Sequence, residues 1–178
     1  MATSFNQESL ATEEIAGRFK KLDGDRSTIL TTARDCSVLT ISSVLPPDGH
    51  KEGDVLPTPY QSVGARLVNN LASKLLMTML PPNSCFFRIM VKDDVKKTLN
   101  DQQNTQADDM IILVEKEAQK LVEQQAIRVV TYELMKSLII TGNALGVKIK
   151  DKGLKSYSLD NYVVLRDYRG NPVEIITK

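Results

Sequence analysis

Two cysteines and one histidine are the residues of this chain whose types suit a thiol nucleophile with an imidazole base, or a zinc site. Cys36 and Cys85 are far apart in sequence, and neither belongs to a short paired motif. His50 lies among turn-forming and charged residues, without the ordered setting and partner carboxylate that a catalytic histidine requires. We therefore expect both cysteines to be buried small hydrophobic residues in a reducing, cytosol-like compartment, and His50 to be solvated.

Other catalytic patterns are missing from the sequence. The glycines are scattered, and no Lys-Ser or Lys-Thr pair follows a glycine-rich turn, so we find no phosphate-binding loop. The carboxylate pairs Asp93-Asp94 and Asp108-Asp109 stand at expected helix starts, where the helix dipole explains them without catalysis. The sequence predicts no enzyme, no cofactor and no metal site.

One basic cluster remains, and it consists of Lys148, Lys150, Lys152 and Lys155. We interpret it as a solvated loop that joins two strands; contact with a DNA backbone or an acidic partner is the alternative. The formal net charge of +1 argues against a free-standing nucleic-acid binder, but it allows passive contact with DNA inside a larger assembly. No apolar run approaches membrane-spanning length, so we predict no membrane segment.

The N-terminal region predicts a helical hairpin from Ser9 to Val44. Its first helix runs from Ser9 to Lys21, and Asp23-Gly24-Asp25 should break it. Asp25 then suits the cap of a second helix. The residues that recur at helical spacing on that second helix are Ile29, Ala33, Cys36 and Thr40.

The clearest helix signals run from Thr58 to Leu80. Thr58 suits the cap, Pro59 the first helical position and Gln61 a capping box, and Pro81-Pro82 ends the helix. The predicted apolar face holds Val63, Leu67, Val68, Leu71, Leu75 and Met79.

A second stripe of the same helix is polar and includes two asparagines in mid-helix. Asparagine is a weak helix former that competes for backbone hydrogen bonds, so the stripe should bond to something packed against it. That partner is either the same chain or a neighbouring subunit. The stripe consists of Ser62, Arg66, Asn69, Asn70 and Ser73.

The rest of the chain changes from helical to β character. Residues 86–91 predict a strand, 93–99 a short charged helical turn, and 100–105 a polar linker. A long helical region from Asp108 to Thr141 bends or splits at residues 124–126 and stops at Gly142-Asn143. Short β-branched strands follow at 144–149, 162–166 and 173–177, with a hairpin turn at 167–171.

These elements indicate an α+β fold, mainly α-helical, with a helical hairpin, two or three long helices and a small antiparallel β element near the C-terminus. We divide the chain into a helical part with one short strand, residues 1–143, and a β-hairpin region, residues 144–178. Because the chain ends directly after a predicted strand, we expect this region to continue in a longer protein.

The run from Thr58 to Arg66, continued by residues 69–75 and by Leu80-Pro81-Pro82, resembles the signature helix of podovirus-type portal proteins, which join capsid to tail in short-tailed bacteriophages. The resemblance covers nearly the whole chain in order. One departure is Leu67, where relatives usually carry glycine, so helix packing here should be wider or differently arranged. Family members are also considerably longer. Further matching positions are Asp35-Cys36, Leu45-Pro46, Arg128-Val129, Tyr132-Glu133, Lys136, Gly142-Asn143, residues 162–164, Arg166-Asp167 and Gly170-Asn171.

The resemblance implies the wing-like part of a subunit of a ring, typically of twelve copies, at one vertex of the virion capsid. Double-stranded DNA would pass through it without sequence specificity, driven in by a separate terminase motor during packaging and released at infection. Capsid, tail adaptor and terminase proteins would be partners, assembly would take place in the host cytoplasm, and the portal would hydrolyse nothing. The subunit-contact or packing candidates are Tyr60, Gln61, Arg66, Asn69, Asn70 and Lys74.

Two other functions are open at this point. The first is a small intracellular adaptor that binds a protein partner through its long helices. The second is a hydrolase that uses His50, which an unaffected His50→Ala variant would exclude.

Overall fold

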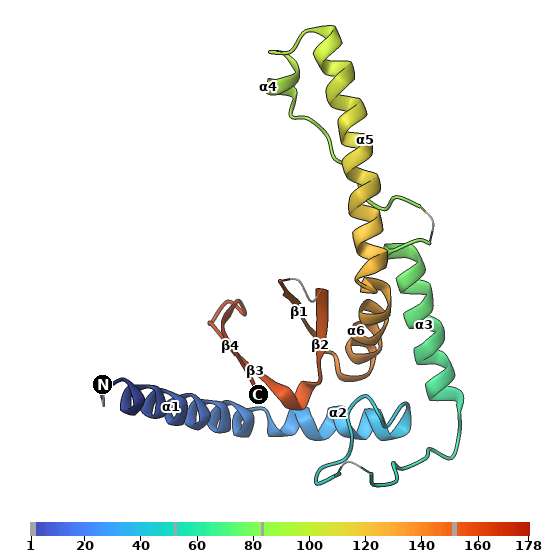
Figure 1. Cartoon of the computed structure of the whole chain (residues 1–178). Coiled ribbons are helices and arrows are strands. Elements are labelled where there is room, and N and C mark those ends of the chain that lie inside the picture. The colour runs from blue at the N-terminus through green and yellow to red at the C-terminus, as the bar shows by residue number, and fades with distance from the viewer. Residues whose placement is uncertain (1–2, 52, 83, 151–152) are drawn as a thin grey trace.

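The computed structural model describes residues 3–51, 53–82, 84–150 and 153–178. These residues form six α-helices and two small antiparallel sheets, which confirms the predicted α+β, mainly helical fold. Figure 1 shows an L-shaped molecule in which α1 and α2 form one limb and α5 rises at the end of the other. The elements are α1 (Thr3–Asp25), α2 (Ser27–Leu39), α3 (Val63–Met79), α4 (Asp93–Lys96), α5 (Asp101–Gln124), α6 (Ile127–Thr141), β1 (Leu145–Ile149), β2 (Gly153–Tyr157), the 3-10 helix η1 (Leu159–Asn161), β3 (Tyr162–Arg166) and β4 (Pro172–Thr177).

The core lies where α1 and α2 meet the two β-hairpins and α6. One buried cluster joins α2 to the loop after it and to η1 and β3. A second cluster joins Phe19 of α1 to Val163 and Ile176 of the second hairpin. Leu45 and Val163 are completely buried, and each such aliphatic side chain contributes about 1.5–3 kcal/mol when it leaves water. The first cluster consists of Leu30, Ala33, Leu45, Leu159 and Tyr162.

Helices α1 and α2 run end to end instead of folding back as a hairpin (Figure 1). Helix α1 continues through Asp23 and Gly24, and only Arg26 separates it from α2. Arg26 has φ −99° and ψ 9°, in the region between helical and extended backbone. Its guanidinium donates two hydrogen bonds to Asp23 Oδ1, at 3.0 and 2.7 Å. The chain therefore keeps its direction. The predicted break at Asp23–Asp25, the Asp25 cap and the hairpin are wrong.

The buried face of α2 differs from the predicted one. Leu30, Ala33 and Ser37 are buried, whereas Ile29 and Cys36 are exposed. Ser37 is buried because its hydroxyl both donates to and accepts from the backbone of the turn that follows the helix. A prediction based on apolar spacing overlooks such a serine. Of the residues predicted for the buried face, only Ala33 is buried.

Helix α3 begins later than predicted and packs against α6. Its cap residue, Ser62, makes no side-chain cap hydrogen bond, and residues 58–61 precede the helix, so the predicted capping box and N-terminal proline are wrong. Gly64 lies against the end of α2, since a Cβ atom there would be 2.9 Å from the Leu39 carbonyl oxygen. The predicted end at Leu80 is confirmed.

Helix α5 begins earlier than predicted because its N-terminus is capped. Asn100 Oδ1 accepts from the Gln103 N–H at 2.9 Å, and Gln103 Oε1 accepts from the Asn100 N–H at 3.1 Å. This reciprocal capping box turns the predicted polar linker at 100–105 into a cap and a first helical turn. The short helical turn after Lys92 is confirmed as α4.

Residues 86–91 form no strand, contrary to the prediction. The Ile89 N–H donates to the Glu115 carboxylate of α5 at 2.7 Å, so this segment has a helix side chain as partner rather than another strand. An isolated extended segment gains no ladder hydrogen bonds, which is why β-branched and aromatic residues alone do not make a strand. We call residues 84–124, which include α4 and α5, the arm.

The predicted split between the two long helices and the predicted stop are confirmed. Ala126 has φ 50°, a left-handed conformation that separates α5 from α6. Gly142 has φ 72° and donates its N–H to the Leu138 carbonyl, as expected for a glycine that ends a helix.

Two antiparallel hairpins follow α6, where one strand and one hairpin were predicted. The strands at 145–149, 162–166 and 172–177 and the turn at 167–171 are confirmed, but β2 was missed. Gly146 allows β1 to approach α6, because a Cβ atom there would lie 2.8 Å from Leu134 Cδ1. Helix α6 contacts α2, α3 and β2 and so joins the helices to the hairpins. The division of the chain at residue 143 stays a prediction.

Candidate subunit-contact surface

The residues that match portal proteins on α6 hold α3 in place. Arg128 donates to the Pro81 carbonyl at 2.7 Å and pairs with Glu123 at 3.0 Å, which connects the end of α3 to the junction between α5 and α6. The Tyr132 hydroxyl donates to Asn69 Oδ1 at 3.2 Å. These contacts fix which side of α3 faces the chain and which side faces outward.

The predicted polar stripe on α3 therefore divides into two sides. Asn69 faces α6, where its side chain accepts the hydrogen bond from Tyr132. Arg66, Asn70 and Lys74 are exposed, and their side chains make no hydrogen bond or ion pair with the residues that the structure describes. A contact within the chain thus explains Asn69. The described part of the chain provides no side-chain hydrogen bond that would explain Asn70.

Tyr60 and Gln61 lie in the segment before α3 and do not join this stripe. Both are exposed, and the Tyr60 side chain is as accessible as in an extended peptide, at 109%. Their proposed role in subunit contact stays a prediction.

The apolar side chains of α3 also divide into two sides. Val68 and Ala72 are buried toward α6, while most of the large residues predicted for the apolar face are exposed. Leu67 is 63% exposed, so the residue that replaces the family's usual glycine points into solvent and does not widen the packing between α3 and α6. We call the exposed side the outer face of α3, and it consists of Val63, Arg66, Leu67, Asn70, Leu71, Lys74 and Met77.

The outer face of α3 is both apolar and basic. Leu67 and Met77 are 63% and 65% exposed, far more than aliphatic side chains in a packed position. Arg66 and Lys74 are the charged residues of α3, which contains no carboxylate. Contiguous exposed apolar residues bordered by one sign of charge mark a surface suited to a protein partner.

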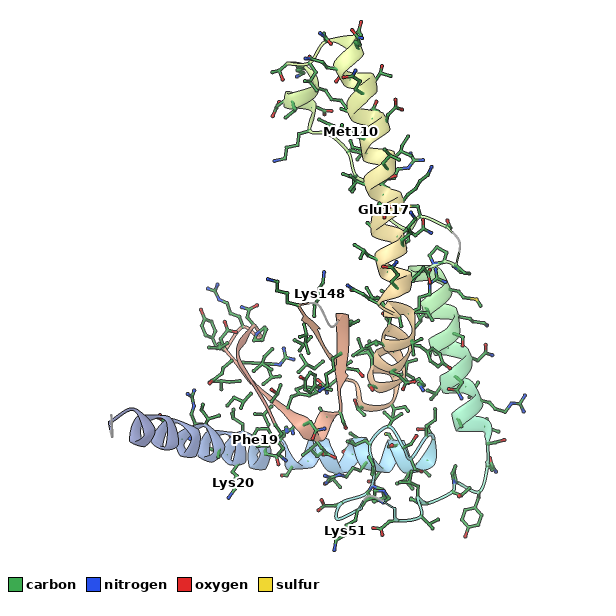
Figure 2. All side chains as sticks on the ribbon, in the orientation of Figure 1. Phe19, Lys20, Lys51, Met110, Glu117 and Lys148 are labelled. Atoms are coloured by element: carbon green, nitrogen blue, oxygen red, sulfur yellow. The ribbon has the colours of Figure 1, made fainter. Side chains whose placement is uncertain are left out.

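Helix α5 carries a second exposed apolar surface. Figure 2 shows two of its members, Met110 and Glu117, on the arm. No described side chain of α5 is buried. The exposed residues recur at helical spacing on one side of the helix, which we call the α5 stripe: Met110, Leu113, Val114, Glu117 and Leu121.

The predicted lysine cluster does not form one surface. Residues 145–149 and 153–157 pair as two antiparallel strands, in which Lys148 pairs with Leu154 and Lys155 pairs with Val147. Directly paired residues share a face, so Lys148 and Lys155 lie on opposite faces of the hairpin. Lys155 lies 4.8 Å from the centre of the Tyr157 ring. Lys148, labelled in Figure 2, is exposed, and so is Lys150. Lys152 lies outside the described residues.

The thiols and the imidazole do not come together as a catalytic group. Cys36 and Cys85 are both exposed free cysteines, so the expected burial is wrong. Cys85 follows the Pro-Pro stop and its thiol donates to the Phe87 carbonyl, while Cys36 lies on the outward side of α2. His50 is partly exposed in its loop, and its imidazole has no hydrogen-bond partner within the described part of the chain.

Titratable groups with shifted pKa values belong to the second hairpin and not to a site. Hydrogen bonds from the Asn171 side chain and from backbone N–H groups of the turn lower the pKa of Asp167. Burial raises the pKa of Tyr162, which is part of the core.

No group of three or more described His, Cys, Asp or Glu residues could hold a metal ion. Within the described ranges, no helix is long and apolar enough to span a bilayer.

The helices α3 and α5 thus carry two exposed, largely apolar surfaces that the core does not cover. Residues 12–178 match the family model of bacteriophage head to tail connecting proteins, and the chain belongs to that family. The predicted resemblance to portal proteins is thereby confirmed.

Individual relatives agree with this family. The portal protein of Enterobacteria phage T3 is 34% identical over 165 residues, which cover 90% of this chain and 31% of the relative. The portal protein of Escherichia phage T7 is 31% identical over 175 residues, with 95% and 33% covered. That of Enterobacteria phage SP6 is 31% identical over 160 residues, with 89% and 31% covered. The chain spans about a third of the length of these relatives.

Proposed function

We propose that this chain is the wing-like part of a subunit of a phage portal ring. The ring would sit at one capsid vertex of the virion, join head to tail and form the conduit for DNA packaging and ejection. The observation that carries the proposal is the family match, which runs from residue 12 to residue 178 and so includes both exposed surfaces.

Ring assembly agrees with the character of the two surfaces. A closed ring of identical subunits uses heterologous contacts, in which one surface of each copy meets a different surface of the next. The outer face of α3 and the α5 stripe are two such different surfaces on one chain. Twelve subunits is the number that the resemblance implies.

The charge of the chain suits a conduit for DNA. A net charge of +1 spread over the surface gives little attraction to phosphates, so DNA could slide past without being held. DNA would be handled without sequence specificity, and a separate terminase would supply the energy. Lys148, Lys150, Lys152 and Lys155 are the residues that we propose as weak contacts with DNA or an acidic partner.

The remaining partners follow from the position of the ring. Capsid proteins would surround it, and tail adaptor and terminase proteins would bind it in turn, with assembly in the host cytoplasm. The portal itself would perform no catalysis. The second candidate function is a small adaptor that binds a protein partner through its long helices. The observation that favours it is the set of exposed apolar residues on α3 and α5, which a different protein could cover as well as a second copy.

Negative-stain electron microscopy of the natural full-length product at low micromolar concentration tests the proposal. We expect closed rings with a central hole, whose subunit number can be counted directly. If the natural product gives only monomers or small oligomers, the portal proposal is contradicted and the adaptor is favoured.

A further inference from the structure

We propose that the outer face of α3 in one subunit docks on the α5 stripe of the neighbouring subunit, with Lys74 opposite Glu117. This inference rests on the proposed ring and specifies which surfaces meet in it. The occupant of each surface is thus a second copy of this chain.

The two surfaces match in apolar character. Leu67, Leu71 and Met77 project from α3 at 63%, 47% and 65% exposure. Met110, Leu113 and Leu121 project from α5 at 69%, 62% and 54% exposure. Two helices pack by inserting such side chains between those of the partner, and removal of this area from water is the main driving force of association. Neither surface is covered within the described part of the chain, and both offer exposed aliphatic side chains for such packing.

The two surfaces are complementary in charge. The outer face of α3 carries Arg66 and Lys74 and no carboxylate, whereas the α5 stripe carries Glu117 and no basic residue. Glu117 lies in the middle of the α5 stripe, and its one ion-pair partner among the described residues is Lys120 of the same helix, at 2.6 Å. Both of those side chains are largely exposed, and an exposed pair of this kind is weak enough to exchange for a partner across an interface.

The same charges exclude pairing of either surface with its own copy. Contact between two α3 outer faces would bring Arg66 and Lys74 close to the same cations of the partner. Contact between two α5 stripes would bring Glu117 close to its own copy on a helix with a surplus of carboxylates. Like-charge contacts oppose association, so the α3-to-α5 arrangement is the favoured one. It is a heterologous contact, which closes into a ring when the rotation between copies divides a full turn.

The two surfaces also cannot cover each other within one chain. Helix α3 packs on α6, with its outer face turned away from that contact, while the arm extends beyond α3 (Figure 1). Neither surface is therefore covered by the other within the chain, and their opposite charges are the reason that we assign a second copy to each.

A reciprocal charge exchange in the natural full-length protein tests the proposal. Lys74→Glu and Glu117→Lys are made singly and together, and the ring fraction is counted by electron microscopy. We expect each single variant to lower the ring fraction about tenfold and the double variant to restore most of it, because opposite charges again face each other. A double variant no better than the single variants overturns the proposal.

Two controls keep the outcomes distinct. Lys20→Glu removes an exposed cation of α1 outside both surfaces and should leave the ring fraction unchanged. Thermal melting of every variant checks that the chain is folded. If the unaltered protein forms no rings, the proposed function fails and this interface fails with it. If rings form and tolerate both single variants, only the interface is wrong.

Disulfide trapping gives a second, independent measurement. Leu67→Cys and Leu113→Cys are combined in a chain whose exposed Cys36 and Cys85 are serines. Mild oxidation of rings should produce a ladder of linked subunits, since bridged cysteines need Cα atoms within about 7 Å. The control combines Leu67→Cys with Ile29→Cys, an exposed position of α2. Intact rings that yield no more linked subunits than this control contradict the proposal.

Discussion

Different interactions stabilise two regions of this molecule, which we call the body and the arm. The body contains α1, α2, α6 and both hairpins, and its core includes completely buried side chains such as Leu45 and Val163. The arm has no buried side chain among its described residues, and its best-defined contacts are the capping box at Asn100 and the bond from Ile89 to Glu115. Hydrophobic burial thus stabilises the body, while the arm depends on local hydrogen bonds and leaves apolar residues uncovered.

The largest expected difference between the two regions is the loss of stability when a leucine is truncated to alanine. Leu45→Ala should lower the free energy of unfolding by about 2–5 kcal/mol, because it leaves a cavity in the core. Leu113→Ala on the arm should change it by less than about 0.5 kcal/mol, since that side chain is 62% exposed. Urea denaturation of the chain measures both values, and similar losses from the two variants would contradict the distinction.

Glycine positions give the next largest effect. Gly64→Ala should destabilise by about 1–3 kcal/mol, because the new Cβ would lie 2.9 Å from the Leu39 carbonyl, which belongs to the backbone and cannot rotate away. The matched control is Gly17→Ala in α1, where a Cβ meets no described atom within 4 Å and should stabilise the helix by about 0.5–1 kcal/mol. Thermal melting compares them, and equal effects would show that the close approach between α3 and α2 is absent.

Removal of the cap should act on the arm alone. Asn100→Ala should weaken the start of α5 by about 0.5–2 kcal/mol, because it removes the acceptor for the Gln103 N–H. Hydrogen exchange should speed up in residues 101–108 while the core amides stay unchanged. Gln102→Ala, at an exposed position next to the cap, is the control. Faster exchange throughout the body would indicate that arm and body unfold together.

The smallest expected effect concerns the second hairpin and pH. The pKa of Asp167 is lowered, so its ionised form is stabilised by folding. That stabilisation is present above the ordinary pKa of 3.8 and is lost as the pH falls through the lower folded pKa. The difference in melting temperature between the unaltered chain and Asp167→Asn should therefore shrink between pH 6 and pH 2. A difference that does not vary with pH would contradict this role of the carboxylate.

Sequence reasoning succeeded where a local signal decides the structure. Gly142 ends α6 because glycine tolerates a positive φ, and the turn at residues 167–171 forms from residues that bond to one another. It failed where a distant contact decides. The buried face of α2 is set by η1 and β3, which lie far along the chain, and the partner of residues 86–91 is a side chain of α5. Two local signals were also missed: the pairing of Arg26 with Asp23, which keeps α1 and α2 in line, and the capping box at Asn100. The outer face of α3 could not be foreseen either, because the side of an apolar helix that stays uncovered depends on where α6 lies.

The most direct test of this account is hydrogen exchange in α5, compared between assembled rings and unassembled chains of the same protein. The account predicts that amides of α5 exchange about tenfold or more slowly in the ring, since a neighbouring subunit covers the α5 stripe there, while core amides such as that of Val163 exchange equally in both states. Identical exchange of α5 in rings and in free chains would show that the arm stays uncovered, and would contradict the account.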